Sequence, residues 1–343
     1  MTPQHGGTDA LGAARHDLST NANACGAWLP ALRAVQAAEA RRYPDPAYTQ
    51  LTAQLAAWHG VAPERIVLGA GASELISRLA CAAALEGARH FWAPPHAYGD
   101  YARASAAAGL VRAAAPEAAA LLWACEPSSP LGQAAADLPL LSRTAAATGA
   151  ALVLDLAYAP LRLDGAPSLP PVARQRLWQL ITPNKALALT GVRAAYAIAP
   201  LKETPLAARV RALAPSWVVG AHGAAMLEHW ASPAAHRWLA ACRVRLRLWR
   251  TRQVQRLRAA GWQPLPSCAN FFVARPPCPA DALPALLAAL RAHGFKLRDC
   301  ASFALPGCVR MAVVHPAVQD ALLAAWKKST GIASLPAHQA GNE

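Results

Sequence analysis

The sequence predicts an α/β fold, with a mainly parallel central sheet in a large domain and a smaller α+β domain after it. From about residue 60 to 200, short apolar runs alternate with alanine-rich helical stretches, as in sheets whose strands are joined by crossover helices. The chain has 343 residues, which is too many for one small core and too few for three ordinary domains. We therefore expect one large and one smaller domain with a cleft between them.

Six apolar runs are expected to form the strands of the large domain. They begin at Arg65, His90, Ala120, Ala151, Leu177 and Ala194. A long helical region is expected over residues 204–260. Within it, arginines recur at helical spacing over residues 237–258, opposite an apolar stripe that includes Leu239 and Leu246. This is the pattern of an amphipathic helix with a solvated basic face.

After residue 260 the pattern changes to that of a smaller α+β domain. Short strands are expected at Asn270, Phe295 and Val309, and helices near residues 279–293 and 316–328. The expected divisions are an N-terminal segment that packs with the small domain, a large ligand-binding domain, a small domain and a tail, over 1–40, 41–235, 236–328 and 329–343. The tail is polar and rich in turn formers, so we expect it to be disordered.

Composition and charge limit the classes of partner. The formal net charge of +14 favours an anionic partner, and both a polyanion and small phosphorylated ligands satisfy it. No aromatic-interleaved or helix-turn-helix pattern accompanies the basic helix, so we expect no nucleic-acid partner. The eight cysteines are scattered without a C-x-x-C pair, which favours reduced thiols and argues against a metal site.

Two further patterns bear on location. No uninterrupted apolar span is long enough for a membrane helix, although 55% of the residues are hydrophobic. Residues 1–14 are polar and glycine-rich, whereas a secretory signal is basic and then apolar. We therefore expect a soluble, cytoplasmic protein without a membrane partner.

Lys185 is the first candidate for covalent chemistry. It ends the segment Thr182-Pro-Asn-Lys, which directly follows an expected strand. Ligands of open α/β sheets bind at the carboxyl ends of the strands, and a lysine desolvated there can be a neutral amine that attacks an aldehyde. Most lysines after a strand are ordinary surface residues, so Lys185 alone does not identify the chemistry.

Asp155 strengthens the case because it ends a five-residue apolar strand. A carboxylate is costly there without a cationic partner. A protonated pyridine nitrogen is such a partner, and pyridoxal 5'-phosphate (PLP) acts as an electron sink while that nitrogen stays protonated. A salt-bridged or helix-capping aspartate would give the same pattern.

A glycine-rich turn, Gly69-Ala-Gly-Ala-Ser-Glu74, lies between an expected strand and an expected helix. The backbone N–H groups of Ala72 and Ser73 and the Ser73 hydroxyl can hold a phosphate at the helix N-terminus. The turn lacks the spacing of the dinucleotide fingerprint and of the Walker loop, so by itself it is a weak signal.

These segments occur in an order that resembles a known family. Along the chain come Tyr43-Pro-Asp-Pro, the glycine-rich turn, Tyr98, Asp155-x-x-Tyr158, Thr182-x-x-Lys185 and Arg193. Over nearly the whole chain, this set resembles the fold-type I PLP-dependent enzymes of the histidinol-phosphate aminotransferase branch. The resemblance implies the fold-type I architecture and PLP as the cofactor.

The family's roles in holding the cofactor fall on individual residues. The resemblance implies that Lys185 holds PLP covalently and that Tyr98 stacks on the pyridine ring. It also implies that Asp155 pairs with the ring nitrogen and that Tyr158 hydrogen-bonds the 3-hydroxyl oxygen. The residues that it assigns to the cofactor phosphate are Ala72, Ser73, Thr182 and Arg193, the last as a charge-assisted clamp.

Tyr43 has a different role by the same resemblance. In the family, the tyrosine of this segment reaches the phosphate in the neighbouring subunit's site, which implies a homodimer with two sites at one interface. Apart from the surrounding motifs, Tyr43 and Tyr98 would be read as ordinary half-buried tyrosines.

Three further segments are similar to the threonine-phosphate decarboxylases of cobalamin biosynthesis. They are Gln4-His-Gly-Gly, Asp17-Leu-Ser-Thr-Asn-Ala-Asn and Arg298-Asp-Cys-Ala-Ser-Phe. The similarity implies that the substrate's phosphate and carboxylate are bound by His5, Asn23, Arg298 and Arg310. A disordered N-terminus would remove His5 from this set.

Three interpretations of the reaction stay open. The main one is decarboxylation of L-threonine O-3-phosphate to (R)-1-amino-2-propanol O-phosphate, and the alternative is transamination of histidinol phosphate or a related amino phosphate. A non-catalytic homologue is a second alternative, because Ser129 stands where the family has an asparagine that donates to the 3-hydroxyl oxygen of PLP. The shorter serine can do so only through a backbone shift or a water molecule.

Overall fold

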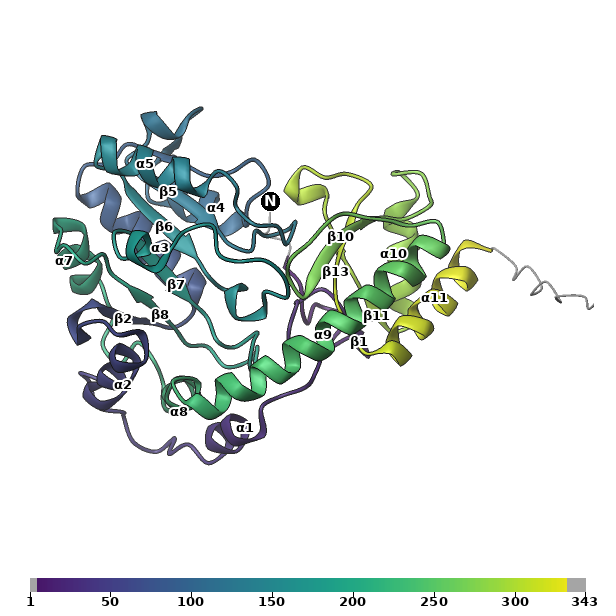
Figure 1. The fold of residues 1–343 in the computed structure, drawn as a ribbon, viewed down its shortest axis with the longest axis horizontal. Coiled ribbons are helices and arrows are strands. Elements are labelled where there is room, and N and C mark those ends of the chain that lie inside the picture. Colours follow the sequence, from purple (N-terminus) through teal and green to yellow (C-terminus); the bar gives the residue numbers. More distant parts are fainter. Residues whose placement is uncertain (1–4, 332–343) are drawn as a thin grey trace, which may run out of the picture.

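The computed structural model describes residues 5–331 and shows a larger α/β body beside a smaller one (Figure 1). The long helix α9 (Pro233–Ala259) begins beside the larger body and runs along the smaller one. Within residues 5–331, no helix is both long and apolar enough to cross a membrane.

The larger body is built on a seven-stranded sheet with the order β2-β8-β7-β6-β5-β3-β4. In that order the strands are Ile66–Gly69, Ala195–Ile198, Trp178–Ile181, Ala151–Asp155, Leu121–Cys125, His90–Trp92 and Val111–Arg112. Strands β7 to β4 run parallel, whereas β8 is antiparallel to both of its neighbours. The expected mainly parallel sheet is therefore confirmed, and each of the six expected runs forms a strand.

Helices cover the sheet. Those of the larger body are α1 (Leu29–Gln36), α2 (Thr49–His59), α3 (Ala72–Leu85), α4 (Gly99–Ala107), α5 (Leu138–Thr148), α6 (Pro171–Arg174), α7 (Pro205–Ala212) and α8 (Ala221–Trp230). Short 3-10 turns lie at Pro63–Arg65, Pro116–Ala118, Ala159–Leu161 and Ala301–Phe303.

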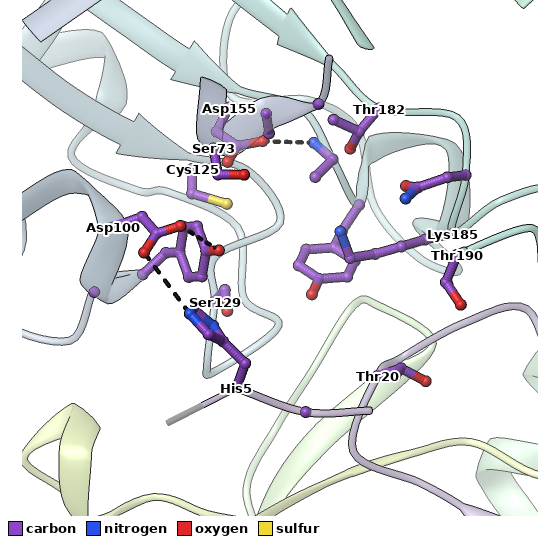
Figure 2. A pocket seen from close by; sticks show the side chains of 18 of the residues that line it. His5, Thr20, Ser73, Asp100, Cys125, Ser129, Asp155, Thr182, Lys185 and Thr190 are labelled. Atoms are coloured by element: carbon purple, nitrogen blue, oxygen red, sulfur yellow. Dashed lines mark hydrogen bonds and ion pairs between the residues drawn. The ribbon is translucent and has the colours of Figure 1, made fainter. Parts of the chain in front are cut away.

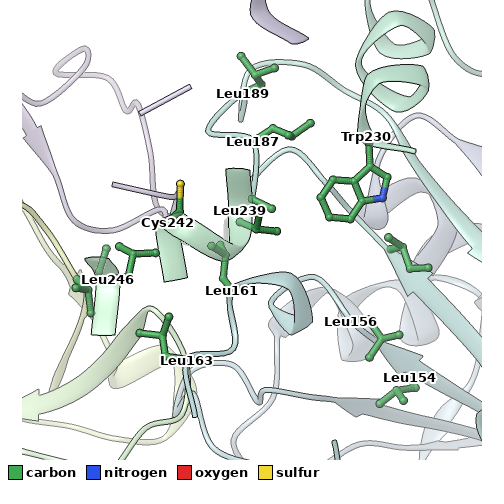
Figure 3. Packing of buried hydrophobic residues seen from close by; sticks show 14 of the residues in the cluster. Leu154, Leu156, Leu161, Leu163, Leu187, Leu189, Trp230, Leu239, Cys242 and Leu246 are labelled. Carbon is green, nitrogen blue, oxygen red and sulfur yellow. The ribbon is translucent and has the colours of Figure 1, made fainter. Parts of the chain in front are cut away.

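The central strands are apolar on both faces because both faces are covered, as is usual in parallel sheets. Along β5, Leu122 packs into one core cluster while Leu121 and Trp123 pack into the other, since successive side chains point to opposite faces. The first cluster continues onto α9, where Leu239 and Leu246 pack near the segment that follows β6 (Figure 3). The apolar stripe expected on this helix is thus its buried face.

The long helical region expected over 204–260 is divided among three helices. Helix α7 ends at Ala212, shortly before Pro215, and α8 does not begin until Ala221. Helix α9 starts anew at Pro233, where the Ser232 hydroxyl accepts a hydrogen bond from the Ala235 N–H. Proline at the first helical position and serine before it are a strong start signal, so the chain re-initiates there.

The smaller body contains an antiparallel sheet with the order β12-β13-β10-β9, formed by Arg298–Asp299, Val309–Ala312, Phe271–Arg275 and Gln263–Pro264. Helices α10 (Leu283–Ala292) and α11 (Pro316–Thr330) accompany it. Strand β1 (His16–Asp17), near the start of the chain, pairs in parallel with β11 (Phe295–Lys296). Helix α11 extends two residues past the expected end at 328, so Ser329 and Thr330 are helical, and the rest of the expected tail, 332–343, lies outside the described residues.

Candidate active site

A pocket of about 860 Å³ lies where the carboxyl ends of the parallel strands face the smaller body. Its volume is within the range of small-molecule sites. Figure 2 shows that its wall combines strand ends, the start of α3 and the N-terminal segment around His5 and Thr20. Within residues 5–331, no three His, Cys, Asp or Glu side chains gather in a way that could hold a metal ion.

Lys185 reaches this pocket from the turn after β7. Its ammonium nitrogen lies 5.2 Å from the centre of the Tyr158 ring. Its backbone oxygen accepts from Asn23 N at 2.9 Å, which fixes the N-terminal segment beside the turn. The amine and the phenol ring thus lie on the same wall of the pocket.

Asp155 is buried at the end of β6 and is hydrogen-bonded on both carboxylate oxygens. Tyr101 Oη donates to Oδ2 at 2.7 Å, and Ala157 N donates to Oδ1 at 2.8 Å. Burial raises the pKa of Asp155, and the Tyr101 hydrogen bond only partly opposes this effect. No described cation lies within salt-bridge distance of the carboxylate, so a protonated ring nitrogen fits the place that remains.

The start of α3 and Arg193 form a cradle that fits a phosphate. A Cβ on Gly71 would lie 2.2 Å from Arg193 Nη2, so only glycine leaves room for the guanidinium there. Ser73 lies in the first turn of α3, where N–H groups are unpaired and the helix dipole favours anions. Thr182 Oγ1 is buried without a hydrogen-bond partner among the described residues. This unsatisfied hydroxyl supports a phosphate ligand at the position that the sequence predicts.

Tyr98 belongs to a network that the sequence did not reveal. Its hydroxyl donates to Asp100 Oδ2 at 2.7 Å, and Arg103 Nε donates to Asp100 Oδ1 at 3.0 Å. His5 Nε2 lies 3.9 Å from the same carboxylate oxygen (Figure 2). Burial, followed by Asp100, raises the pKa of Tyr98. Asp100, buried two residues after Tyr98, thus connects His5 to the Tyr98 ring.

The smaller body contributes Arg298 and Arg310. Arg310 Nη1 donates to Ser129 Oγ at 3.2 Å, and its Nη2 donates to Ser19 O at 2.7 Å. Arg298 donates to Ser302 Oγ at 2.7 Å, and its guanidinium lies 4.8 Å from the centre of the Phe303 ring. Burial and the nearby Arg310 lower the pKa of Arg298. Two cations this close favour a ligand with negative charge.

Two of the predicted residues do not line the pocket. Asn23 is buried beside it, where Nδ2 donates to Ala186 O at 3.0 Å and Oδ1 accepts from Cys25 N at 3.0 Å. Its side chain is thereby occupied in holding the backbone. Tyr43 is 77% exposed, and its ring stacks on Trp217 with 4.4 Å between centres.

The residues that the sequence analysis missed include Asp100, Tyr101 and Arg103, which line the pocket, and Asn21, which lies behind Tyr158. Asn21 Nδ2 donates to Tyr158 Oη at 3.3 Å from a left-handed backbone conformation. The acidic residue in the first turn of α4 was a usable signal for Asp100, because a carboxylate close in sequence to a site tyrosine can accept a hydrogen bond from its hydroxyl. Asn21 and Tyr101 gave no signal, since their roles depend on contacts across the fold.

Comparison with known proteins gives consistent results at the level of family and fold. The family model of aminotransferase class I and II matches residues 15–116 and 109–325. A histidinol-phosphate aminotransferase of Thiobacillus denitrificans is 30% identical over 334 residues, 90% of either chain. One from Ruegeria pomeroyi is 28% identical over 320 residues, 86% of either chain.

The solved structures that share the fold include two with related printed activities. Histidinol-phosphate aminotransferase from Sinorhizobium meliloti, in complex with PLP, superposes with a TM-score of 0.76 at 23% identity and covers 93% of this chain and 92% of its own. L-threonine-O-3-phosphate decarboxylase from Porphyromonas gingivalis gives a TM-score of 0.76 at 20% identity, with 92% and 99% covered. The fold-type I architecture is thus confirmed, and the chain belongs to the aminotransferase class I and II family of PLP-dependent enzymes.

Proposed function

We propose that this enzyme acts on a small amino compound that carries a phosphate ester. The observation that carries the proposal is the pair of arginines in the pocket. Arg193 beside Gly71 serves the cofactor phosphate, whereas Arg298 and Arg310 enter from the smaller body. Two further guanidinium groups fit a substrate with a phosphate or with a phosphate and a carboxylate.

Each residue at the cofactor has a chemical task. PLP, when bound, supplies an electron sink for the bond broken at Cα of the substrate. Asp155 keeps the ring nitrogen protonated, and Tyr158, held by Asn21, presents its hydroxyl to the 3-hydroxyl oxygen. Lys185 would hold the cofactor, and its amine, which lies in the pocket, would be placed to move a proton at Cα of the substrate. Ala72, Ser73, Thr182 and Arg193 bind the cofactor phosphate, and Ser129 is already engaged by Arg310.

Transamination of histidinol phosphate or a related amino phosphate is the reaction with the stronger support. Curated relatives that match most of this chain at about 30% identity carry that activity in their names. For this reaction Arg298 and Arg310 would bind the phosphate of the substrate and, where the substrate has one, its carboxylate, and bound PLP would supply the electron sink for loss of the Cα proton.

Decarboxylation of L-threonine O-3-phosphate is a second candidate, and the position of His5 favours it. The imidazole lines the pocket, 6.1 Å from the centre of the Tyr98 ring, where the threonine-phosphate decarboxylases are expected to have such a residue. If His5 and one arginine bind the phosphate, one arginine fewer would hold the carboxylate, and bound PLP would supply the electron sink for loss of CO2.

A paired product assay separates the two reactions. Histidinol phosphate with 2-oxoglutarate should yield glutamate, and threonine phosphate should yield either a keto acid or CO2 and the amino alcohol phosphate. Glutamate formation supports the first candidate, and CO2 release without a keto acid supports the second. A purified protein that stays colourless after incubation with PLP would contradict both and favour a non-catalytic homologue. The Lys185→Ala variant should lose the covalent visible absorption band.

We also propose that the enzyme is a homodimer in which Tyr43 reaches the neighbouring subunit's cofactor phosphate. The exposed, stacked pair of Tyr43 and Trp217 supports this proposal, because large exposed aromatic side chains are typical of interfaces. Along the chain, we propose that the N-terminal segment, the PLP-binding domain and the small domain occupy 1–40, 41–235 and 236–328.

A further inference from the structure

We propose that a second cavity, on the other side of the strand ends that form the active pocket, binds a small free dianion such as a phosphate monoester. The cavity measures about 580 Å³, which is within the range of small-molecule sites. It lies between the segment that follows β6, helix α6 and helix α9. Its charged side chains are Glu126, Arg162, Asp164, Arg174, Arg243 and Arg247.

The charges of this cavity are not balanced. Arg162 Nη2 pairs with Glu126 at 2.9 Å, and Arg247 Nε pairs with Asp164 at 3.2 Å. Asp164 is also engaged by Arg250, so neither carboxylate is free for another arginine. Four arginines therefore line the cavity against two carboxylates that are already paired.

Arg174 and Arg243 are the two cations that remain. Both are half-buried, and neither side chain has an ion-pair or hydrogen-bond partner within residues 5–331. Arg174 Nε is shielded from solvent and lacks an acceptor. A buried donor without an acceptor costs free energy, and a charged one costs more. An anion between α6 and α9 would supply the missing acceptors, and the planar fork of arginine suits a phosphate group.

The cavity shares a wall with the active pocket. Cys125 and Asp155 line the active pocket, whereas the next residues, Glu126 and Leu156, line the second cavity. Successive side chains at the ends of β5 and β6 thus point to opposite sides. Glu126 N donates to Asp155 O at 3.0 Å, so the two strand ends are also hydrogen-bonded to each other. An anion in the cavity would contact the segments that position Asp155.

The test uses the PLP-loaded enzyme and inorganic pyrophosphate as the probe. Arg174→Gln and Arg243→Gln are combined, and pyrophosphate binding is measured by isothermal titration calorimetry. We expect saturable binding to the wild type that the double variant weakens at least about tenfold, because two charge-assisted contacts are lost. Cofactor absorbance and circular dichroism verify that the double variant folds. If it does not fold, the single Arg243→Gln variant provides the same comparison.

The matched control is the double variant Arg176→Gln and Arg245→Gln. Both residues are exposed, neither lines the cavity, and the change in net charge is the same. We expect pyrophosphate to bind this control as it binds the wild type. Equal losses in the two double variants would indicate general attraction to a basic surface and overturn the proposal, as would unchanged binding in both.

The active pocket can also bind pyrophosphate, so its contribution is measured separately. Arg310→Gln should weaken that contribution and leave binding to the cavity intact. If Arg310→Gln removes all binding, the cavity is not a site. Because the readout is binding and not turnover, this result is independent of which amino phosphate the enzyme converts.

Discussion

Asp155 is a buried carboxylate whose surroundings suit a cationic ligand. Two neutral donors hold its oxygens, burial raises its pKa, and no described cation forms a salt bridge with it. A buried carboxylate without a cationic partner is costly, and a protonated ring nitrogen would supply that partner. The same reasoning applies to Thr182, whose buried hydroxyl has no partner among the described residues.

The Asp155→Asn variant should lower kcat at least about 100-fold, because the ring nitrogen then loses the charge that keeps it protonated. Steady-state kinetics with the accepted substrate and the pH dependence of the visible absorption band measure the effect. The Asp155→Glu variant keeps the charge and should retain more activity than Asp155→Asn. A kcat near that of the wild type in Asp155→Asn would contradict the assigned role.

Asp100 should act as a positioning residue for Tyr98 and His5. We expect Asp100→Asn to raise KM about tenfold with a smaller change in kcat, because the Tyr98 hydroxyl, Arg103 and His5 all lose a charged acceptor. Cofactor absorbance should persist. Arg103→Gln serves as a comparison, since it removes one contact and leaves the other two. Equal effects on KM from both variants would indicate that Asp100 acts only through Arg103.

Among the elements, α2 is attached to the sheet by a histidine in its last turn. His59 Nε2 lies 2.7 Å from Tyr196 Oη of β8, and burial, with a smaller effect of His236, lowers the pKa of His59 to about 4. The unfolded chain therefore binds more protons than the folded one between its ordinary pKa of 6.5 and about 4. Stability from this group is present above pH 6.5 and is lost as the pH falls through that window.

The loss at the low end of this window should be about 3 kcal/mol in the free energy of unfolding, if His59 alone is counted. The His59→Gln variant should show a shallower fall of unfolding free energy between pH 7 and 4, measured by denaturant titration. His222→Gln is the control, because His222 is exposed on the neighbouring α8. If His59→Gln left the slope of unfolding free energy against pH unchanged, groups other than His59 would cause the pH dependence of stability.

At the level of elements, the sequence predicted the central strands well because they are buried on both faces and read as continuous apolar runs. Strand β4 was missed, since Val111 and Arg112 are both exposed at the sheet edge and carry no such pattern. The break before α9 was visible in Ser232 and Pro233, but the surrounding helical spacing masked it. The expected parallel sheet predicted that strand ends would form a wall of the pocket. The hydrogen bonds of Asp100 could be seen only in the three-dimensional structure.

The whole molecule should be a dimer if Tyr43 has the role proposed for it. Tyr43→Phe should leave the dimer intact and increase the dissociation constant of PLP about tenfold, because a hydrogen bond to the phosphate is lost. Light scattering after gel filtration gives the oligomeric state, and equilibrium dialysis gives the PLP affinity. The shared site would be contradicted if the wild type were monomeric and its dissociation constant for PLP equalled that of Tyr43→Phe.

The pairing of β1 with β11 also determines when this enzyme can become functional during its synthesis. Arg310 donates to the backbone of Ser19 across a separation of 291 residues, and β1 can pair only after Phe295 and Lys296 have been made. The side of the pocket formed by Ser19 and Arg310 therefore assembles last, after the sheet that carries Asp155. Contacts this distant along the chain close slowly, so the wall proposed for the cofactor can form before the wall proposed for the substrate.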